Sequence, residues 1–333
     1  MSLAELSREK RGERIFTVTP NRTILNIGLV AVVAAVPLSI VTRSTTGSSI
    51  APHWIMGVAI IALAMGIPHG AVDYLTLATT RSRRSLLLMG AAYLGLAVAA
   101  AAAVMAAPGP AFVLVLIMTV WHFGTGDVEA GHELDGTPPE TGITRVIHAL
   151  AAGSAPVLLP LTSPAAISTL QQIQPRLADV FTPALITGVR TAVFTLIVVA
   201  LLMLIEQGRL RAALELAALT VLGYVVAPLL AFAIYFSLWH SLRHTARLSL
   251  HACGGVSARS IGRTFLLGLP ALLGTMVVVG VIVAITASAT ISAAWLWIGL
   301  ALVWGLTVPH MTLVALFDHH QHVTGTSEAG RTR

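Results

Sequence analysis

The sequence predicts an all-α polytopic membrane protein, a bundle of roughly eight to ten transmembrane helices. The first reason is composition: the chain of 333 residues is 56% hydrophobic and 10% charged, and its mean hydropathy is +0.85. A soluble domain of this composition would expose large apolar patches. The second reason is that apolar runs of about 20 residues, long enough to cross a bilayer, recur without an intervening polar domain.

One transmembrane domain is expected over residues 23–317, between a basic N-terminal segment, residues 1–22, and a polar cytoplasmic tail, residues 318–333. Proline interrupts a helix, so we divide residues 211–249 at Pro228, although one span followed by a half-buried amphipathic segment also fits. The predicted spans lie near residues 23–42, 53–78, 85–107, 110–127, 143–161, 184–206, 211–227, 229–249, 263–287 and 291–317.

The basic residues predict the orientation of these spans in the cell membrane. The opening segment lacks the short apolar core and small residues of a cleaved signal peptide, so the first span is expected to stay in the membrane. The positive-inside rule places the N-terminus in the cytoplasm. The residues that agree are Arg8, Lys10, Arg11 and Arg14 before the first span, and Arg81, Arg83, Arg84, Arg209, Arg211, Arg259 and Arg263 in later loops, whereas Arg43 and Arg176 lie on the opposite side.

Charge and cysteine content exclude two other classes. The net charge is +6, but the arginines are spread over short loops, so no nucleic-acid partner is expected. Cys253 is the only cysteine, which excludes an intrachain disulfide and a thiolate cluster. Any metal must therefore be held by histidine, aspartate or glutamate.

Five histidines are embedded in the predicted spans. They are His69 in GIPHGAVDYL, His122 in TVWHFGTGD, His240 and His244 in FSLWHSLRHTARL, and His310 in LTVPHMTL. All lie in even-numbered spans, which run inward, and all lie in the last third to half of the span. They therefore share one depth toward the cytoplasmic side. His240 and His244, four residues apart, face the same side of a helix.

For a single histidine in a membrane span, a hydrogen bond between helices is as good an interpretation as a functional role. Five histidines at one depth favour a shared metal or polar site. Neutral imidazole binds first-row transition metals. His310 is the least certain member of the group, because it is expected to support a ligand ring rather than bind the metal itself. Asp73, four residues after His69, either supports a ligand ring or reaches water. Asp127 is expected to be a solvated helix cap.

The glycines, tryptophans and other histidines are expected to have structural or surface positions. Glycines beside the histidines, among them Gly70 and Gly124, would let a helix or an extended ligand approach closely. Trp121 and Trp239 are expected to wall an apolar cavity or pack in the core. The histidines expected at the surface or in the solvated tail are His53, His132, His148, His251, His319, His320 and His322.

The segments PHGAVD, WHFGTGD, WHSLRH and VPHM, in this order over roughly residues 53–317, resemble the Brp/Blh family of membrane-bound β-carotene 15,15′-dioxygenases. The resemblance implies cleavage of the central double bond of β-carotene by O₂ into two all-trans-retinal molecules. It also implies Fe²⁺ as the cofactor, with His69, His122, His240 and His244 as the metal ligands and catalytic residues. Four neutral nitrogens suit ferrous iron and leave a position for dioxygen.

Two other functions remain open from the residues alone. A membrane di-iron desaturase or hydroxylase also uses H-x-x-x-H, but this chain lacks the H-x-x-H-H boxes. A metal or proton transporter could use intramembrane histidines, although no paired halves are visible. For the oxygenase, the expected partners are the carotenoid, O₂ and membrane lipid, with a functional link to a rhodopsin as user of the retinal. A tunnel roughly parallel to the membrane plane is expected for the substrate.

Overall fold

The computed structural model describes residues 21–46, 61–62, 64–66, 68–71, 82–253, 255–285 and 293–329. Within these ranges every regular element is a helix, which confirms the all-α fold class. The elements are α2 (Arg22–Thr46), α4 (Pro68–Ala71), α6 (Arg83–Ala106), α7 (Pro108–Asp135), α8 (Gly142–Leu161), α9 (Pro164–Ile173), α10 (Pro175–Ala178), α11 (Pro183–Glu206), α12 (Leu210–Val225), α13 (Pro228–Ile234), the π-helix η1 (Tyr235–Ser241), α14 (Leu242–Cys253), α15 (Ala258–Ile285) and α16 (Ala293–Ala329).

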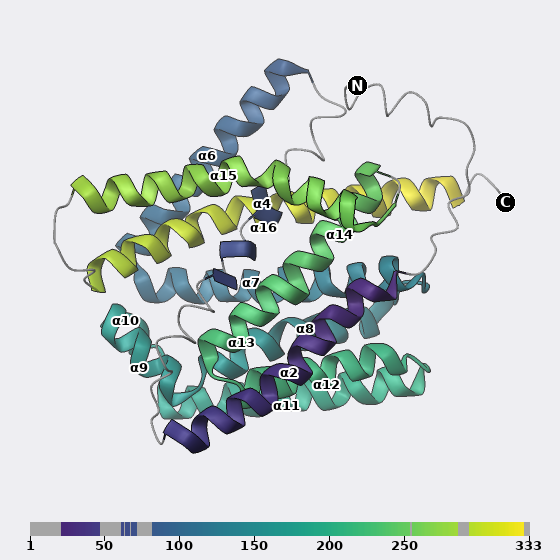
Figure 1. The fold of residues 1–333 in the computed structure, drawn as a ribbon, viewed down its shortest axis with the longest axis horizontal. Helices are drawn as coiled ribbons and strands as arrows, with labels where there is room; N and C mark the ends of the chain where they lie inside the picture. Colours follow the sequence, from purple (N-terminus) through teal and green to yellow (C-terminus); the bar gives the residue numbers. More distant parts are fainter. Residues whose placement is uncertain are drawn as a thin grey trace.

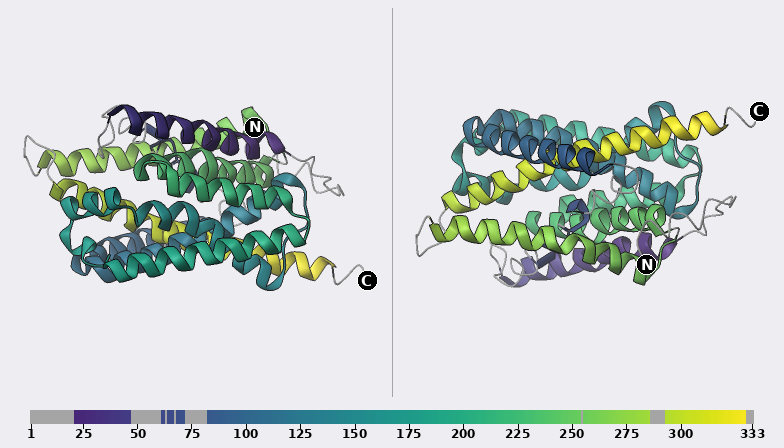
Figure 2. Two further views of the ribbon diagram at one scale, coloured as in Figure 1. Left: turned by 90° about the horizontal axis from the view of Figure 1, so that it is seen from below. Right: turned by 90° about the horizontal axis from the view of Figure 1, so that it is seen from above.

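Helices α7, α11, α12, α15 and α16 run roughly along the longest dimension of the molecule, whereas α2, α6 and the segment from α13 to α14 run obliquely to it in Figure 1. Two further views of the bundle are given in Figure 2. Helix α8 packs against α7, α11 and α12, while α6 packs against α16. The chain from α13 through η1 to α14 contacts α2, α7 and α8. The middle of the bundle is therefore built mainly from α7, α8 and the η1 region.

Six helices in the described ranges are long and apolar enough to cross a membrane, which makes the chain a multi-pass membrane protein. Side chains such as Leu87 and Leu202 are exposed on the outer faces, as expected for contact with lipid. The predicted total of eight to ten spans stays a prediction. The six candidates are Arg22–Val41, Arg84–Ala106, Pro108–Asp135, Gly142–Leu161, Pro183–Glu206 and Trp297–Leu316.

Prolines mark the first turns of several helices. Proline has no backbone N–H and its fixed φ suits the start of a helix. The break predicted at Pro228 is confirmed, because α12 ends at Val225 and α13 begins at Pro228. The predicted tail is partly helical, since α16 continues through residues 318–329. The first-turn prolines are Pro108, Pro164, Pro175, Pro183 and Pro228.

Helices α7 and α8 cross at two glycines that face each other. A Cβ atom built on Gly124 would collide with the carbonyl oxygen of Ala149, and one built on Gly153 would collide with that of Val120. Small residues allow membrane helices to approach until their backbones touch. Of the two expectations for Gly124, the close approach of a helix is confirmed, because this position is filled by the backbone of α8.

We expect Gly124→Ala and Gly153→Ala to force α7 and α8 apart and to destabilise the protein by about 1–3 kcal/mol, the usual cost of overpacking. The measurement is the melting temperature of the detergent-purified protein. Gly131→Ala, also on α7, is the matched control, because its Cβ would meet nothing within 4 Å. Equal melting temperatures for Gly124→Ala and Gly131→Ala would contradict the packing assignment.

Candidate metal centre

The structure brings together the five embedded histidines from different parts of the chain. Each of the five is nearly buried, with exposed fractions between 1% and 7%. His310 in α16 and His244 in α14 approach the rings of the other helices, which lie far from them in sequence. The five are His69 in α4, His122 in α7, His240 in η1, His244 in α14 and His310 in α16.

The five imidazole rings lie within one small volume. The ring centroids of His122 and His310 are 4.9 Å apart, and those of His69 and His310 are 5.1 Å apart. His240 lies 5.3 Å from His122 and 5.5 Å from His69. His244 lies 5.5 Å from His69, 5.9 Å from His310 and 6.3 Å from His240. The convergence that the sequence predicted is thus present in the fold.

The π-helix η1 sets the position of His240. Residues five apart in an α-helix point about 140° away from each other, whereas the i→i+5 hydrogen bonds of a π-helix place them nearly one above the other. Tyr235 and His240 are such a pair, and both bond the same carboxylate. The Tyr235 hydroxyl donates to Asp127 Oδ2 at 2.8 Å, and His240 Nδ1 lies 3.0 Å from Asp127 Oδ1.

Asp127 is therefore a buried partner of His240, and the expectation of a solvated helix cap is wrong. Helix α7 does not end near residue 127 but continues to Asp135, so Asp127 lies inside it with an exposed fraction of 5%. A carboxylate can only accept, so the Nδ1 of His240 carries the hydrogen. The lone pair of His240 is left on Nε2, the nitrogen that faces away from Asp127.

His69 is oriented in the same way by a different acceptor. Its Nδ1 lies 2.5 Å from the carbonyl oxygen of Gly66 and 3.0 Å from Ser241 Oγ. The carbonyl can only accept, which again places the hydrogen on Nδ1 and the lone pair on Nε2. Asp73, the other expected supporting residue, lies outside the described residues.

A metal ion fits these residues by donor type and spacing. The Nε2 atoms of His69, His122 and His240 are buried and have no hydrogen-bond partner among the described residues, an arrangement that costs free energy unless another group binds there. Two imidazoles that bind one ion at about 2.1 Å have ring centres roughly 4.5–6.5 Å apart. The measured separations of 4.9–6.3 Å fall in this range.

Apart from His240 and His244, which stack at an angle of 15°, the described rings are packed edge to face rather than closed around a point. His69 and His310, for example, are inclined at 90°. In the described part of the chain, no group of three or more His, Cys, Asp or Glu side chains has its donor atoms already arranged to hold a metal ion. Binding would therefore require rotation of the rings about their side-chain torsions.

Aromatic side chains cover part of the histidine cluster. The ring of Phe123 lies 4.3 Å from that of His240, and the ring of Phe236 lies 5.2 Å from that of His69. Phe232 stacks on Phe236 at an angle of 10°. These side chains exclude water from the cluster on this side. Trp239 packs in the core, which confirms one of the two expectations for it. Trp121 is 45% exposed and faces outward.

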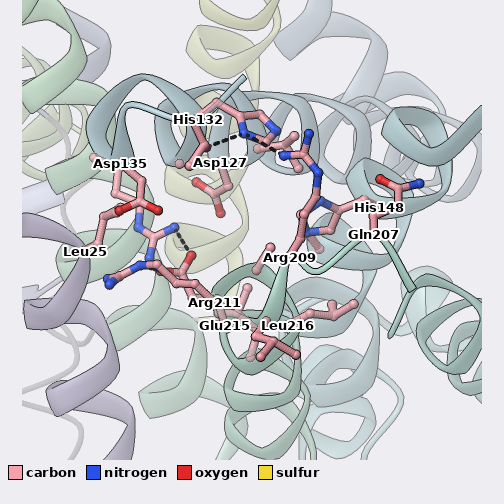
Figure 3. A pocket seen from close by; sticks show the side chains of 18 of the residues that line it. Leu25, Asp127, His132, Asp135, His148, Gln207, Arg209, Arg211, Glu215 and Leu216 are labelled. Carbon is pink, nitrogen blue, oxygen red and sulfur yellow. Dashed lines mark hydrogen bonds and ion pairs between the residues drawn. The ribbon is translucent and has the colours of Figure 1, made fainter. Parts of the chain in front are cut away.

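A cavity of about 350 Å³ with charged residues in its wall begins on the other side of Asp127 (Figure 3). Arg211 Nε and Arg243 Nη1 lie 3.1 Å and 2.9 Å from the two carboxylate oxygens of Glu215 in its wall. Such a charged lining does not suit a carotenoid, so this cavity is not the expected substrate tunnel. The tunnel itself stays a prediction.

His132 and His148 are buried beside this cavity, and the expectation that they lie at the surface is wrong. The loop after α7 brings Glu140 between them, 3.0 Å from His148 Nδ1 and 3.5 Å from His132 Nε2. Burial alone would raise the pKa of Glu140, but the hydrogen bonds with the two histidines outweigh it and lower the pKa to about 2. Glu140 thus joins the ends of α7 and α8. The other histidines expected at the surface, His53, His251, His319, His320 and His322, lie outside the described side chains.

The fold and the site together define a polytopic helical membrane protein with a buried cluster of imidazoles. A family model described as Beta-carotene 15,15'-dioxygenase matches residues 59–318, which include all five histidines. The chain belongs to this family. It is 31% identical over 258 residues to the probable beta-carotene 15,15'-dioxygenase Blh of Halobacterium salinarum, covering 68% of this chain and 70% of the relative. No solved structure matches the chain significantly.

We expect Asp127→Asn to weaken the orientation of His240 and to lower metal affinity and activity by about 10-fold to 100-fold, the usual effect of losing such a partner. Asp135→Asn is the matched control on the same helix, because Asp135 pairs with Arg22 away from the histidines. The measurements are iron retained during dialysis against a chelator and the rate of product formation. If Asp127→Asn retained iron as the parent protein does, Asp127 would have only a structural role.

Proposed function

We propose that this protein cleaves the central 15,15′ double bond of β-carotene with O₂ to give two molecules of all-trans-retinal, using iron held by His69, His122, His240 and His244. The observation that carries the proposal is the group of buried Nε2 atoms without hydrogen-bond partners, on His69, His122 and His240. The family match supports the reaction class. Ferrous iron would supply the activation of dioxygen when bound.

The residues around the cluster would hold its imidazoles in place. Gly66 and Asp127 each accept a hydrogen bond from Nδ1, from His69 and His240 respectively, which keeps both Nε2 lone pairs available. Such partners fix the tautomer and the direction of a ligand ring. Asp127 is itself held by the Tyr235 hydroxyl, so the direction of His240 is determined by two hydrogen bonds in series.

The apolar side of the cluster suits an apolar substrate. Phe123 and Phe236 lie against the rings of His240 and His69, and they would exclude water from reactive species during cleavage. The proposal includes a location in the cell membrane with the N-terminus in the cytoplasm, and a rhodopsin as one user of the retinal.

We expect His69→Ala, His122→Ala, His240→Ala and His244→Ala each to lower retinal formation by more than about 100-fold and to reduce bound iron, because a lost ligand costs more than a lost supporting partner. The assay is expression in cells that accumulate β-carotene, with retinal measured by chromatography and iron by elemental analysis of the purified protein. His319→Ala, His320→Ala and His322→Ala are controls that should keep activity.

Full activity of His240→Ala with normal iron content would overturn the ligand assignment. Two irons per chain would favour the di-iron desaturase or hydroxylase. Uptake of metal into vesicles without any change in added carotenoid would favour a transporter. Loss of colour together with retinal formation by the parent protein, and neither in the four variants, is the expected result.

A further inference from the structure

His310 occupies a position inside the histidine cluster. Its ring lies 4.9 Å from that of His122, 5.1 Å from that of His69 and 5.9 Å from that of His244. The first two are the smallest separations between histidine rings in the described part of the chain. His310 therefore contacts three of the four proposed ligands, and it is 6% exposed.

The positions behind two of the ligands are already filled by other groups. A side chain that supports a ligand from behind must bond its outer nitrogen, which is Nδ1 when Nε2 faces the metal. Nδ1 of His69 is taken by the Gly66 carbonyl and Ser241, and Nδ1 of His240 by Asp127. His310 is therefore not the group that supports His69, which is its nearest proposed ligand after His122.

The backbone of α4 lies close to one edge of the His310 ring. A Cβ atom built on Gly70 would lie 3.2 Å from Nδ1 and 3.4 Å from Cγ of His310. The Nδ1 edge of the ring therefore rests against Gly70, the residue that follows His69. Only glycine leaves room for the ring here without displacing it. Nε2, on the opposite edge of the ring, is directed away from this backbone.

From these contacts we propose that His310 is a fifth nitrogen ligand of the same iron centre, contributed by α16. This inference rests on the proposed function, because it concerns the same ion. His310 would add a fifth neutral nitrogen of the kind that ferrous iron accepts as a ligand. It would also tie α16 to α4, α7 and α14 through a shared ion.

The test is the number of nitrogen neighbours of iron, measured by X-ray absorption on the full-length, detergent-purified protein loaded with Fe²⁺. We expect five histidine nitrogens in the parent protein and four in His310→Ala, with iron affinity lowered by at least about 10-fold. Thr312→Ala is the matched control on α16, because Thr312 is exposed and its hydroxyl bonds only the carbonyl of Val308 in its own helix. It should retain the parent spectrum and affinity.

Gly70→Ala gives an independent test that keeps all five histidines. Its methyl group would press on Nδ1 of His310 at 3.2 Å, so the ring must move by a few tenths of an ångström and iron affinity should fall. Gly131→Ala should leave affinity unchanged. This variant decides the question if His310→Ala fails to fold.

The outcomes separate this inference from the proposed function. Iron with four histidine nitrogens in the parent protein, unchanged in His310→Ala, would overturn the fifth ligand while leaving the four-histidine centre intact. A parent protein that binds no iron and forms no retinal would overturn both. Five nitrogens in the parent and four in His310→Ala would establish His310 as a ligand.

Discussion

The contact between Nδ1 of His240 and the carboxylate of Asp127 is the interaction on which the arrangement of the candidate centre depends. It joins η1 to α7, and it determines which nitrogen of His240 is available. The π-helical turn is needed for it, because only that geometry brings Tyr235 and His240 to one carboxylate. Gly126 contributes by its size, since a Cβ there would lie 3.4 Å from Cε1 of His240. A local departure from α-helical geometry at a functional site is common for π-helices.

Helix α7 packs against α8 on one face and presents residues to the histidine cluster on another. Gly124 lies against the backbone of α8, while His122 and Asp127 face the cluster. Backbone contact at a glycine crossing leaves little freedom for one helix to slide along the other. The same crossing therefore fixes the height at which His122 and Asp127 meet the residues of η1. The Glu140 contacts with His132 and His148 hold the ends of the same two helices.

Hydropathy and spacing predicted the fold class, most span boundaries and the convergence of the five histidines, because lipid requires long apolar helices and makes embedded polar residues conspicuous. The same signals could not locate the end of α7. Its last turns carry charged residues, which are typical of a loop, so the sequence predicts a solvated Asp127 and a surface His132. In the fold these turns pack against α8 and α14, where Glu129 pairs with Arg145 and Glu133 with Arg247. The π-helix has no pattern in the sequence. The role of Gly124 depends on which helix lies opposite, and a single sequence does not contain that information.

Besides orienting the ring of His240, Asp127 brings a negative charge to the cluster. Imidazole ligands are neutral, so an ion with two positive charges would enter the bundle without compensation, and an uncompensated charge in a medium of low dielectric is costly. Asp127 is a carboxylate that bonds a ring of the cluster directly. Its charge would offset part of that of the ion through a single imidazole. A carboxylate behind His240, rather than on a bound metal, would compensate charge and would leave the apolar side, at Phe123 and Phe236, free of polar groups that an apolar substrate could not satisfy.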